Sequence, residues 1–270
     1  MASLKNKYGE WALVTGASSG IGKEFVRLLA QEGFNIVLVA RREDLLSDLA
    51  TEIHKTSKVD TRVVALDMLQ KGAVTELYNR VSDLDIGLVI PAAGIDEMGQ
   101  FLEKDYLSLE QMLTLNINVP TEIAHLFGQK MSARKRSAMI MVSSLFAYQG
   151  IPNFATYAAS KAYILTLGEA LNVELRKRGI DVLVLSPGLT DTPFAQNLGL
   201  NLSRLPMIAQ KPRTVAKTGL RSLGRSSSVV SGFLNKFYAW ENRLIPRHWP
   251  VNLFGFLING AIASHKRKST

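Results

Sequence analysis

Tyr157 and Lys161 stand four residues apart, and Ser144 precedes the tyrosine by thirteen residues. A spacing of four on a helix puts both side chains on one face. A free tyrosine, with a pKa near ~10, exchanges protons poorly at pH 7. One ammonium about 4 Å away supplies roughly 4 kcal/mol in an effective dielectric of ~20, which lowers such a pKa by about three units.

These three residues predict acid–base chemistry on a carbonyl or an alcohol. A carbonyl that receives a hydride carries the charge on its oxygen, and that oxygen needs a proton. We expect Tyr157 to exchange that proton and Ser144 to donate to the developing oxyanion. A Tyr-x-x-x-Lys spacing by itself also fits a solvent-exposed helix pair, so other motifs must decide.

A glycine-rich turn spans residues 15–22, with Gly16, Gly20 and Gly22 in the spacing G-x-x-x-G-x-G. Glycines let the backbone turn sharply and approach a pyrophosphate, and free N–H groups at the following helix start face the anion. The turn is the first strand-to-helix connection of the chain. This position predicts a dinucleotide site, with a purely structural turn as the alternative.

The residues after the second predicted strand indicate which dinucleotide binds. An acid there would hold the ribose 2′-hydroxyl of NAD, but this chain has Arg41 and Arg42. Two guanidiniums favour a 2′-phosphate, so we expect NADP(H), with two solvated arginines as the alternative. Asp67, after the third strand, is expected to accept from the adenine amine or to cap a helix.

Short apolar runs alternate with segments of helical period. Strands are expected at Trp11–Thr15, Asn35–Ala40, Thr61–Leu66, Ile86–Ile90, Ala138–Val142 and Asp181–Leu185, with a seventh near Val229–Val230. Helices are expected at Lys23–Gln31, Glu43–His54, Gly72–Val81, Leu109–Ser132 and Tyr157–Arg178. This alternation favours one α/β domain over residues 1–270, a doubly wound parallel sheet with helices on both faces and a C-terminal helical extension.

Together these motifs resemble the short-chain dehydrogenase/reductase family over residues 10 to about 192. The matching positions, in order and at family spacing, are residues 15–22, Asp67, Gly94, Asn116, Ser143, Ser144, Tyr157, Lys161 and residues 187–192. The resemblance implies a Rossmann-like fold. It also implies an enzyme that uses NADP(H) to interconvert a carbonyl and an alcohol.

The resemblance implies a role for each matched residue in binding the cofactor. Those expected at the phosphates are Gly16, Ser18, Ser19, Gly20 and Ile21. Ala93 and Gly94 would lie beside the adenine ribose. Further cofactor contacts are expected from Pro187, Gly188, Thr190 and Thr192, the last of them at the nicotinamide amide.

The resemblance also assigns the catalytic roles. Tyr157 would be the acid–base, Lys161 would bind the nicotinamide ribose and tune Tyr157, and Ser144 would orient the carbonyl. Asn116, in a helix kink, would hold a water that relays protons to Lys161, with Asn118 as the rival for that role. One departure is Pro91-Ala92-Ala93-Gly94, where the family has Asn-Asn-Ala-Gly, so we expect weaker bracing between strands there.

The positive charge belongs to the C-terminal quarter. Residues 1–200 hold 20 Lys and Arg against 22 Asp and Glu, whereas residues 201–270 hold 12 against one. The absence of cysteine excludes disulfide scaffolds, cysteine-ligated zinc and thiol nucleophiles, and we expect no metal site. Without a signal-peptide pattern or a run of ~18 to 20 apolar residues, we expect a cytoplasmic protein.

Residues 193–270 are expected to form a substrate lid and a basic, aromatic extension. The lid candidates, which also fit core packing, are Leu198, Leu200, Leu202, Leu205 and Met207. From Phe233 to Phe256, aromatic residues alternate with cations, which fits peripheral contact with an anionic membrane, a subunit interface or a pocket wall. No recognition motif accompanies the charge, so nucleic acid is not an expected partner.

The sequence thus predicts an NADP(H)-dependent carbonyl reductase or alcohol dehydrogenase for an apolar, lipid-like or steroid-like small molecule. We expect a homodimer or homotetramer. One alternative is a 3-oxoacyl-thioester reductase whose basic extension meets an acidic acyl carrier. A non-catalytic NADP-binding sensor or scaffold is the other, and the presence of Asn116, Ser144, Tyr157 and Lys161 disfavours it.

Overall fold

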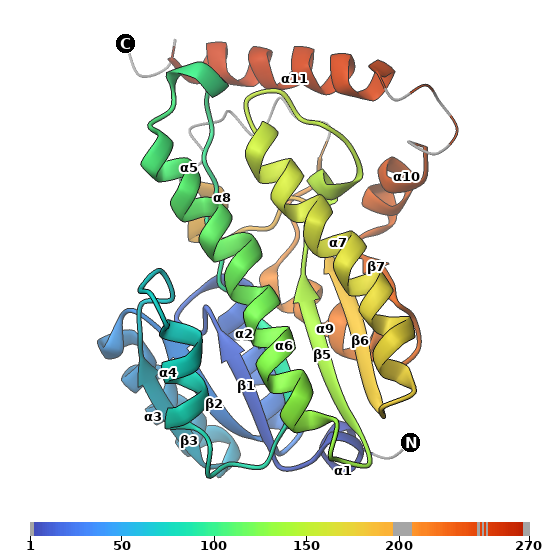
Figure 1. Ribbon diagram of the computed structural model, residues 1–270. Coiled ribbons are helices and arrows are strands. Elements are labelled where there is room, and N and C mark those ends of the chain that lie inside the picture. Colours follow the sequence, from blue (N-terminus) through green and yellow to red (C-terminus); the bar gives the residue numbers. More distant parts are fainter. Residues whose placement is uncertain (1–2, 197–206, 242–243, 245, 247, 267–270) are drawn as a thin grey trace.

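Seven parallel strands form one sheet in the computed structural model, which describes residues 3–196, 207–241, 244, 246 and 248–266. The strands are β1 (Trp11–Thr15), β2 (Asn35–Ala40), β3 (Thr61–Ala65), β4 (Ile86–Pro91), β5 (Ser137–Val142), β6 (Ile180–Ser186) and β7 (Ser228–Val230). Their order is β3-β2-β1-β4-β5-β6-β7, so the chain reverses its direction of winding between β1 and β4 (Figure 1). The predicted doubly wound sheet is confirmed, with every strand end within one residue of expectation.

Helices cover both faces of this sheet because alternate strand residues point to opposite sides. Val14 faces a core shared with α2 (Gly20–Gln31), α3 (Glu43–Ser57) and α9 (Pro212–Ser222). Leu13 faces the other core, under α4 (Ala73–Arg80), α6 (Val119–Met131) and α7 (Ala155–Arg176). The predicted helices are therefore present, with ends that shift by at most three residues where they are single elements.

The helix predicted over Leu109–Ser132 is interrupted. It consists of α5 (Tyr106–Leu113), a π-helical turn η2 (Thr114–Asn118) and α6. Pro120 at the start of α6 has no N–H to donate to the carbonyl four residues earlier, that of Asn116. The kink expected at Asn116 is thus confirmed, and its form is a π turn, a feature that often marks functional sites.

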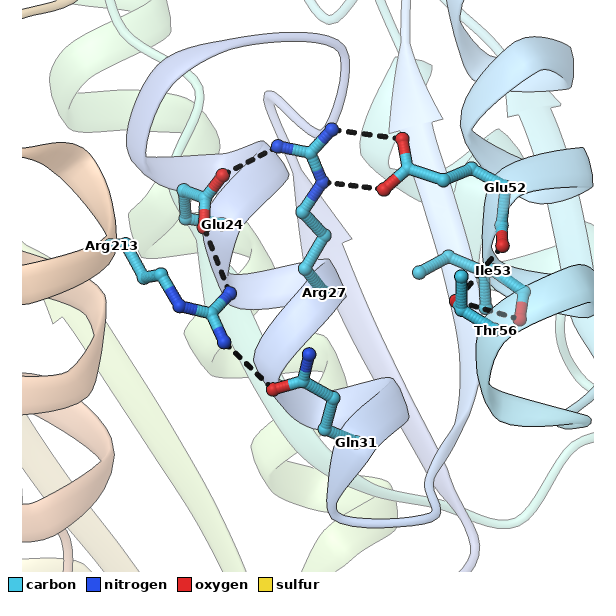
Figure 2. A network of polar contacts seen from close by, with 7 residues as sticks. All are labelled: Glu24, Arg27, Gln31, Glu52, Ile53, Thr56 and Arg213. Atoms are coloured by element: carbon cyan, nitrogen blue, oxygen red, sulfur yellow. Dashed lines mark hydrogen bonds and ion pairs between the residues drawn. The ribbon is translucent and has the colours of Figure 1, made fainter.

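A network of charged side chains ties α9 to the N-terminal helices (Figure 2). Arg27 of α2 donates to both carboxylate oxygens of Glu52 on α3, at 2.7 and 2.8 Å, and to Glu24 at 2.6 Å. Arg213 of α9 donates to the other oxygen of Glu24 at 3.3 Å and to Gln31 at 2.9 Å. Glu24 therefore links α2 to α9, helices on the same face of the sheet that are 189 residues apart at this contact.

The C-terminal extension contains α10 (Phe233–Glu241) and α11 (His248–Lys266), after the short α8 (Pro193–Gln196). Figure 1 shows α11 across the end toward which the strands point, opposite the N-terminal α1 (Leu4–Tyr8), which the sequence did not predict. The four leucines of the expected lid, Leu198 to Leu205, lie outside the described residues. Within the described chain, no helix is long and apolar enough to cross a membrane.

Candidate active site

A cavity of about 230 Å³ opens at the carboxyl ends of the central strands. Its lining comes from the segments that follow β1, β4, β5 and β6, together with α8, Met207 and the start of α7. Ligands of doubly wound sheets bind outside the carboxyl ends, where the strand order reverses. We call this space the site cavity.

The glycine turn after β1 has a geometry that only glycine permits at its start. Gly16 has a φ of +67°, and a Cβ there would lie 2.9 Å from the backbone N and Cα of Ala93. A Cβ on Gly22 would lie 2.2 Å from the carbonyl oxygen of Gly16. Because Ser19 makes no side-chain cap to α2, the first N–H groups of this helix remain available to an anion.

This cradle fits the diphosphate of a dinucleotide. Gly16, Ser19, Gly20 and Ile21 line the site cavity, as does Gly94. Ala93 and the residues expected at the nicotinamide end, Pro187, Gly188, Thr190 and Thr192, also line it. A Cβ on Gly20 would lie 3.2 Å from Cγ2 of Thr192, so the expected phosphate and nicotinamide contacts adjoin.

Four other predicted cofactor residues lie outside the cavity lining. Arg41 and Arg42 are exposed at the start of α3, and Nη2 of Arg42 donates to Oγ of Ser18 at 2.9 Å. This bond joins the guanidinium to the glycine turn. Oδ1 of Asp67 accepts from the backbone N–H of Leu69 at 3.0 Å within a turn, whereas the next helix, α4, has Gly72 at its N-cap, so the helix-cap alternative is wrong and the adenine contact stays a prediction.

Ser144, Tyr157 and Lys161 converge in the cavity. Tyr157 is 9% and Lys161 7% exposed, so the alternative of a solvent-exposed helix pair is wrong. Ser144 begins the 3-10 turn η3 (Leu145–Tyr148) and hydrogen-bonds with Tyr157. Nζ of Lys161 donates to the carbonyl of Val142 at 3.2 Å and lies 5.7 Å from the centre of the Tyr157 ring.

The charge states of these side chains follow from burial. Burial raises the pKa of the Tyr157 phenol, the hydrogen bond with Ser144 lowers that pKa in part, and the charge of Asp96 raises it further. Burial lowers the pKa of the Lys161 ammonium to about 8. Burial is the largest influence on the Tyr157 pKa here, and the Lys161 ammonium points at Val142, so the expected lowering of the Tyr157 pKa by Lys161 stays a prediction. Tyr157 keeps its proton at neutral pH, the form that can protonate a carbonyl oxygen.

The π turn directs Asn116 into the interior. Its Nδ2 donates to the carbonyl of Ile95 at 2.7 Å and to Oγ of Ser160 at 3.3 Å, while Oδ1 accepts from the N–H of Ile95 at 3.0 Å. A Cβ on Gly94 would lie 3.1 Å from Oδ1 of Asn116 and 3.5 Å from Nζ of Lys161. Asn116 therefore adjoins the lysine, whereas the rival Asn118 is exposed.

The departure at Pro91 alters how the strands are braced. The N–H of Ala93 donates to the Thr15 hydroxyl at 3.1 Å, which ties the end of β4 to β1. On the other side, β4 pairs with β5 only as far as Val89 and Met139. The strands β4 and β5 consequently lose their pairing where the cavity begins, in agreement with the weaker bracing expected there.

Sequence reasoning missed residues that shape the remainder of the cavity. Its apolar lining comes from Leu145, Phe146, Phe154, Leu189 and Phe194, and from Met207, the one expected lid residue that the structure describes. Among the described residues the lining contains one carboxylate, Asp96. Asn235 of α10 is also new: it is 4% exposed, and a Cβ on Gly188 would lie 2.3 Å from its Nδ2. A position just past Gly94, at a strand's carboxyl end, was the one available signal for Asp96.

The comparisons with known proteins agree with this geometry. A family model described as short chain dehydrogenase matches residues 10–202. The 7beta-hydroxysteroid dehydrogenase of Clostridium sardiniense is 33% identical, over 91% of this chain and 94% of that one. The very-long-chain 3-oxoacyl-CoA reductase of Podospora anserina is 30% identical, over 96% of this chain and 73% of its own.

Solved structures give the same result over most of the chain. A 7beta-hydroxysteroid dehydrogenase studied for its stereoselectivity superposes with a TM-score of 0.86 at 32% identity, and covers 94% of this chain and 100% of its own. A short-chain dehydrogenase of Sphingobium yanoikuyae in complex with NADPH gives a TM-score of 0.77 at 25% identity, over 87% and 93%. The similarity thus extends into the C-terminal extension.

Proposed function

Since this chain belongs to the short chain dehydrogenase family, we propose that it is a reductase for apolar ring ketones, with NADPH as the reductant. It is an oxidoreductase that acts on CH–OH and C=O groups and takes a nicotinamide cofactor. One observation carries the proposal: Ser144 and the buried Tyr157 and Lys161 share a cavity with the glycine turn and an apolar wall.

The preference for NADP(H) over NAD(H) rests on charge. Arg41 and Arg42 stand where an acid would repel a 2′-phosphate, and Arg42 is bonded to Ser18 of the glycine turn. A short-chain dehydrogenase of similar fold binds NADPH. The two guanidiniums would receive the 2′-phosphate, while the N-terminus of α2 would receive the diphosphate.

The proposed roles of the chain's own residues follow from their protonation. The bound nicotinamide supplies the hydride to the carbonyl carbon, or removes it from the alcohol. Ser144 donates a hydrogen bond to the carbonyl oxygen and stabilises the negative charge that develops there. Tyr157, protonated at neutral pH, gives its proton to that oxygen, and in the reverse direction it accepts the proton of the alcohol. Lys161 lines this end of the cavity, and Asn116 lies beside it behind Gly94.

The apolar substrate class is supported by the cavity wall and by two relatives. Phe146, Phe154 and Phe194 lie within ring-contact distances of Tyr157, at 6.2, 6.5 and 6.0 Å between centroids. The hydroxysteroid dehydrogenase relative points to a fused-ring ketone. The 3-oxoacyl-CoA reductase relative favours a second candidate, a 3-oxoacyl thioester with a long chain.

Oxidation of NADPH by the purified full chain tests the proposal. The panel contains steroid ketones, smaller ring ketones, aldehydes and 3-oxoacyl thioesters, each with NADPH and with NADH. We expect turnover of ring ketones and at least about tenfold preference for NADPH. Turnover of thioesters alone would favour the second candidate. Binding of NADPH without any turnover would favour the sensor.

Two further proposals concern association. We place a homo-oligomer contact on the outer faces of α5 and α7, where Leu113, Tyr163 and Val173 are exposed. We place peripheral contact with an anionic membrane on α10 and α11, whose exposed large side chains are Phe233, Phe237, Trp240, Trp249, Leu253 and Phe256. The basic charge of residues 201–270 favours an anionic surface.

Co-sedimentation with vesicles separates these association surfaces. We expect the full chain to bind phosphatidylserine-containing vesicles at low salt and to bind them more weakly at high salt. It should not bind pure phosphatidylcholine vesicles. Replacement of Phe233, Phe237 and Trp240 by alanine should weaken binding, whereas Val173→Ala should change only the oligomeric state. If the folded parent protein does not bind anionic vesicles at low salt, the proposed membrane contact is wrong.

A further inference from the structure

Asp96 lines the site cavity together with Ser144 and Tyr157, and the reaction described above does not use it. Its Oδ2 atom is buried and has no hydrogen-bond partner among the residues that the structure describes. Native proteins satisfy almost all buried acceptors, because an unsatisfied one loses its hydration without compensation. A ligand atom in the cavity is the natural partner for this oxygen.

In the described chain, the charged side chains that act on Asp96 are Lys104 and Glu97. Lys104 is near enough for its charge to act on Asp96, but its ammonium donates to the backbone carbonyl of Glu97. Burial raises the pKa of the Asp96 carboxyl to about 6. At pH 7 the side chain is therefore mostly a carboxylate, a hydrogen-bond acceptor without a proton to donate.

The surroundings decide which ligand group suits this acceptor. An anionic group would be repelled by Asp96 itself. An ammonium would meet Lys161 in the same cavity and the charge of Lys104 beside Asp96. A neutral hydroxyl carries neither penalty, and it donates well to a carboxylate. The remaining wall is largely apolar, which fits a hydrocarbon skeleton that bears this one hydroxyl.

We propose that Asp96 accepts a hydrogen bond from a substrate hydroxyl that is distinct from the reacting carbonyl. The enzyme would then select hydroxylated ring ketones over their deoxy counterparts. This inference rests on the proposed function and narrows its substrate class. Asp96 acts as a specificity-determining residue, since it contacts a part of the substrate that does not react.

The test compares steroid ketones in matched sets, each with a free hydroxyl, its methyl ether, or hydrogen at one carbon. We expect the parent protein to prefer the free hydroxyl at one ring position by about ten- to hundredfold in kcat/KM, the value of a hydrogen bond to a charged group. The methyl ether should behave as the deoxy compound does, because it has no hydrogen to donate.

Variants assign this preference to the carboxylate. Asp96→Ala should reduce the preference, measured as the ratio of kcat/KM for the hydroxyl and deoxy ketones, to less than about threefold, and Asp96→Asn should lie between. Glu97→Gln removes a neighbouring carboxylate that is outside the cavity lining and should keep the preference. NADPH affinity checks that each variant is folded.

The failures of the two proposals differ. If the parent protein reduces no ketone, the proposed function fails and this inference with it. If the parent reduces ketones but discriminates no hydroxyl from its methyl ether at any position, the proposed function stands and the inference is wrong. Retained discrimination in Asp96→Ala would also overturn it.

Discussion

The motif region and the C-terminal extension contribute to the same cavity in different ways. The motif region, residues 15–22, 92–94, 142–161 and 187–192, presents glycine turns and buried polar atoms to the interior. The extension contributes Met207 to the lining, and its helices α10 and α11 support the lining from behind: Phe254 and Ile258 pack with Phe154 and Tyr157, and Asn235 packs against Gly188.

The difference shows what each task requires. Chemistry needs particular atoms within hydrogen-bonding distance, so the motif region tolerates few residue types at each position. Support needs shape and buried apolar area, which many residues supply. The extension is consequently free to carry exposed aromatics and most of the net positive charge, the features on which the proposed membrane contact rests.

Removal of the acid in the motif region should have the largest effect. Tyr157→Phe keeps the ring and removes the proton, so kcat should fall by about 10²- to 10⁴-fold while NADPH affinity stays within a few-fold. Tyr163→Phe on the same helix is the control, because Tyr163 is 41% exposed and outside the cavity. If steady-state kinetics show that Tyr157→Phe retains the kcat of the parent protein, Tyr157 is not the proton donor.

Removal of an anchor in the extension should act on stability instead. Phe254 is 5% exposed against the core beside Tyr157, so Phe254→Ala should lower the free energy of unfolding by about 3–5 kcal/mol. Phe256 on the same helix is 78% exposed, and Phe256→Ala should change it by less than about 0.5 kcal/mol. Urea unfolding measures both. Equal effects would mean that α11 is not part of the single predicted domain.

The charge at the cofactor end should show a smaller, selective effect. Replacement of both Arg41 and Arg42 by alanine should weaken NADPH binding about ten- to hundredfold and leave NADH within a few-fold. Arg178→Ala removes an exposed guanidinium near the far end of α7 and should change neither. Fluorescence titration measures the affinities. If the parent protein binds NADPH and NADH with equal affinity, Arg41 and Arg42 do not select between the two dinucleotides.

Asp96 should impose a modest pH dependence on stability. Because its pKa is raised from 3.8 to about 6, the folded protein binds more protons than the unfolded chain between about pH 4 and 6. Its contribution to the free energy of unfolding therefore falls as pH rises through this range. Asp96→Asn should remove that slope in urea unfolding, and Glu97→Gln should keep it. An unchanged slope in Asp96→Asn would contradict the burial of this carboxyl.

The elements that sequence predicts well are those with a local cause. The seven strands follow from short apolar runs, and the kink at Asn116 accompanies Pro120 four residues later. The short helix α1 was missed because its sequence is polar. Its Tyr8 is nonetheless fully buried, held by a hydrogen bond of 2.8 Å to Asp181, a partner 173 residues away.

The sequence by itself determined the sheet, the glycine cradle and the identity of Ser144, Tyr157 and Lys161, because spacing along the chain fixes a turn or a helix face. Only the tertiary structure decided the burial of Tyr157, the place of Asn235 beside Gly188 and the buried oxygen of Asp96. Each of these depends on contacts with, or desolvation by, segments that are distant in the sequence. No local pattern of residues encodes such long-range effects.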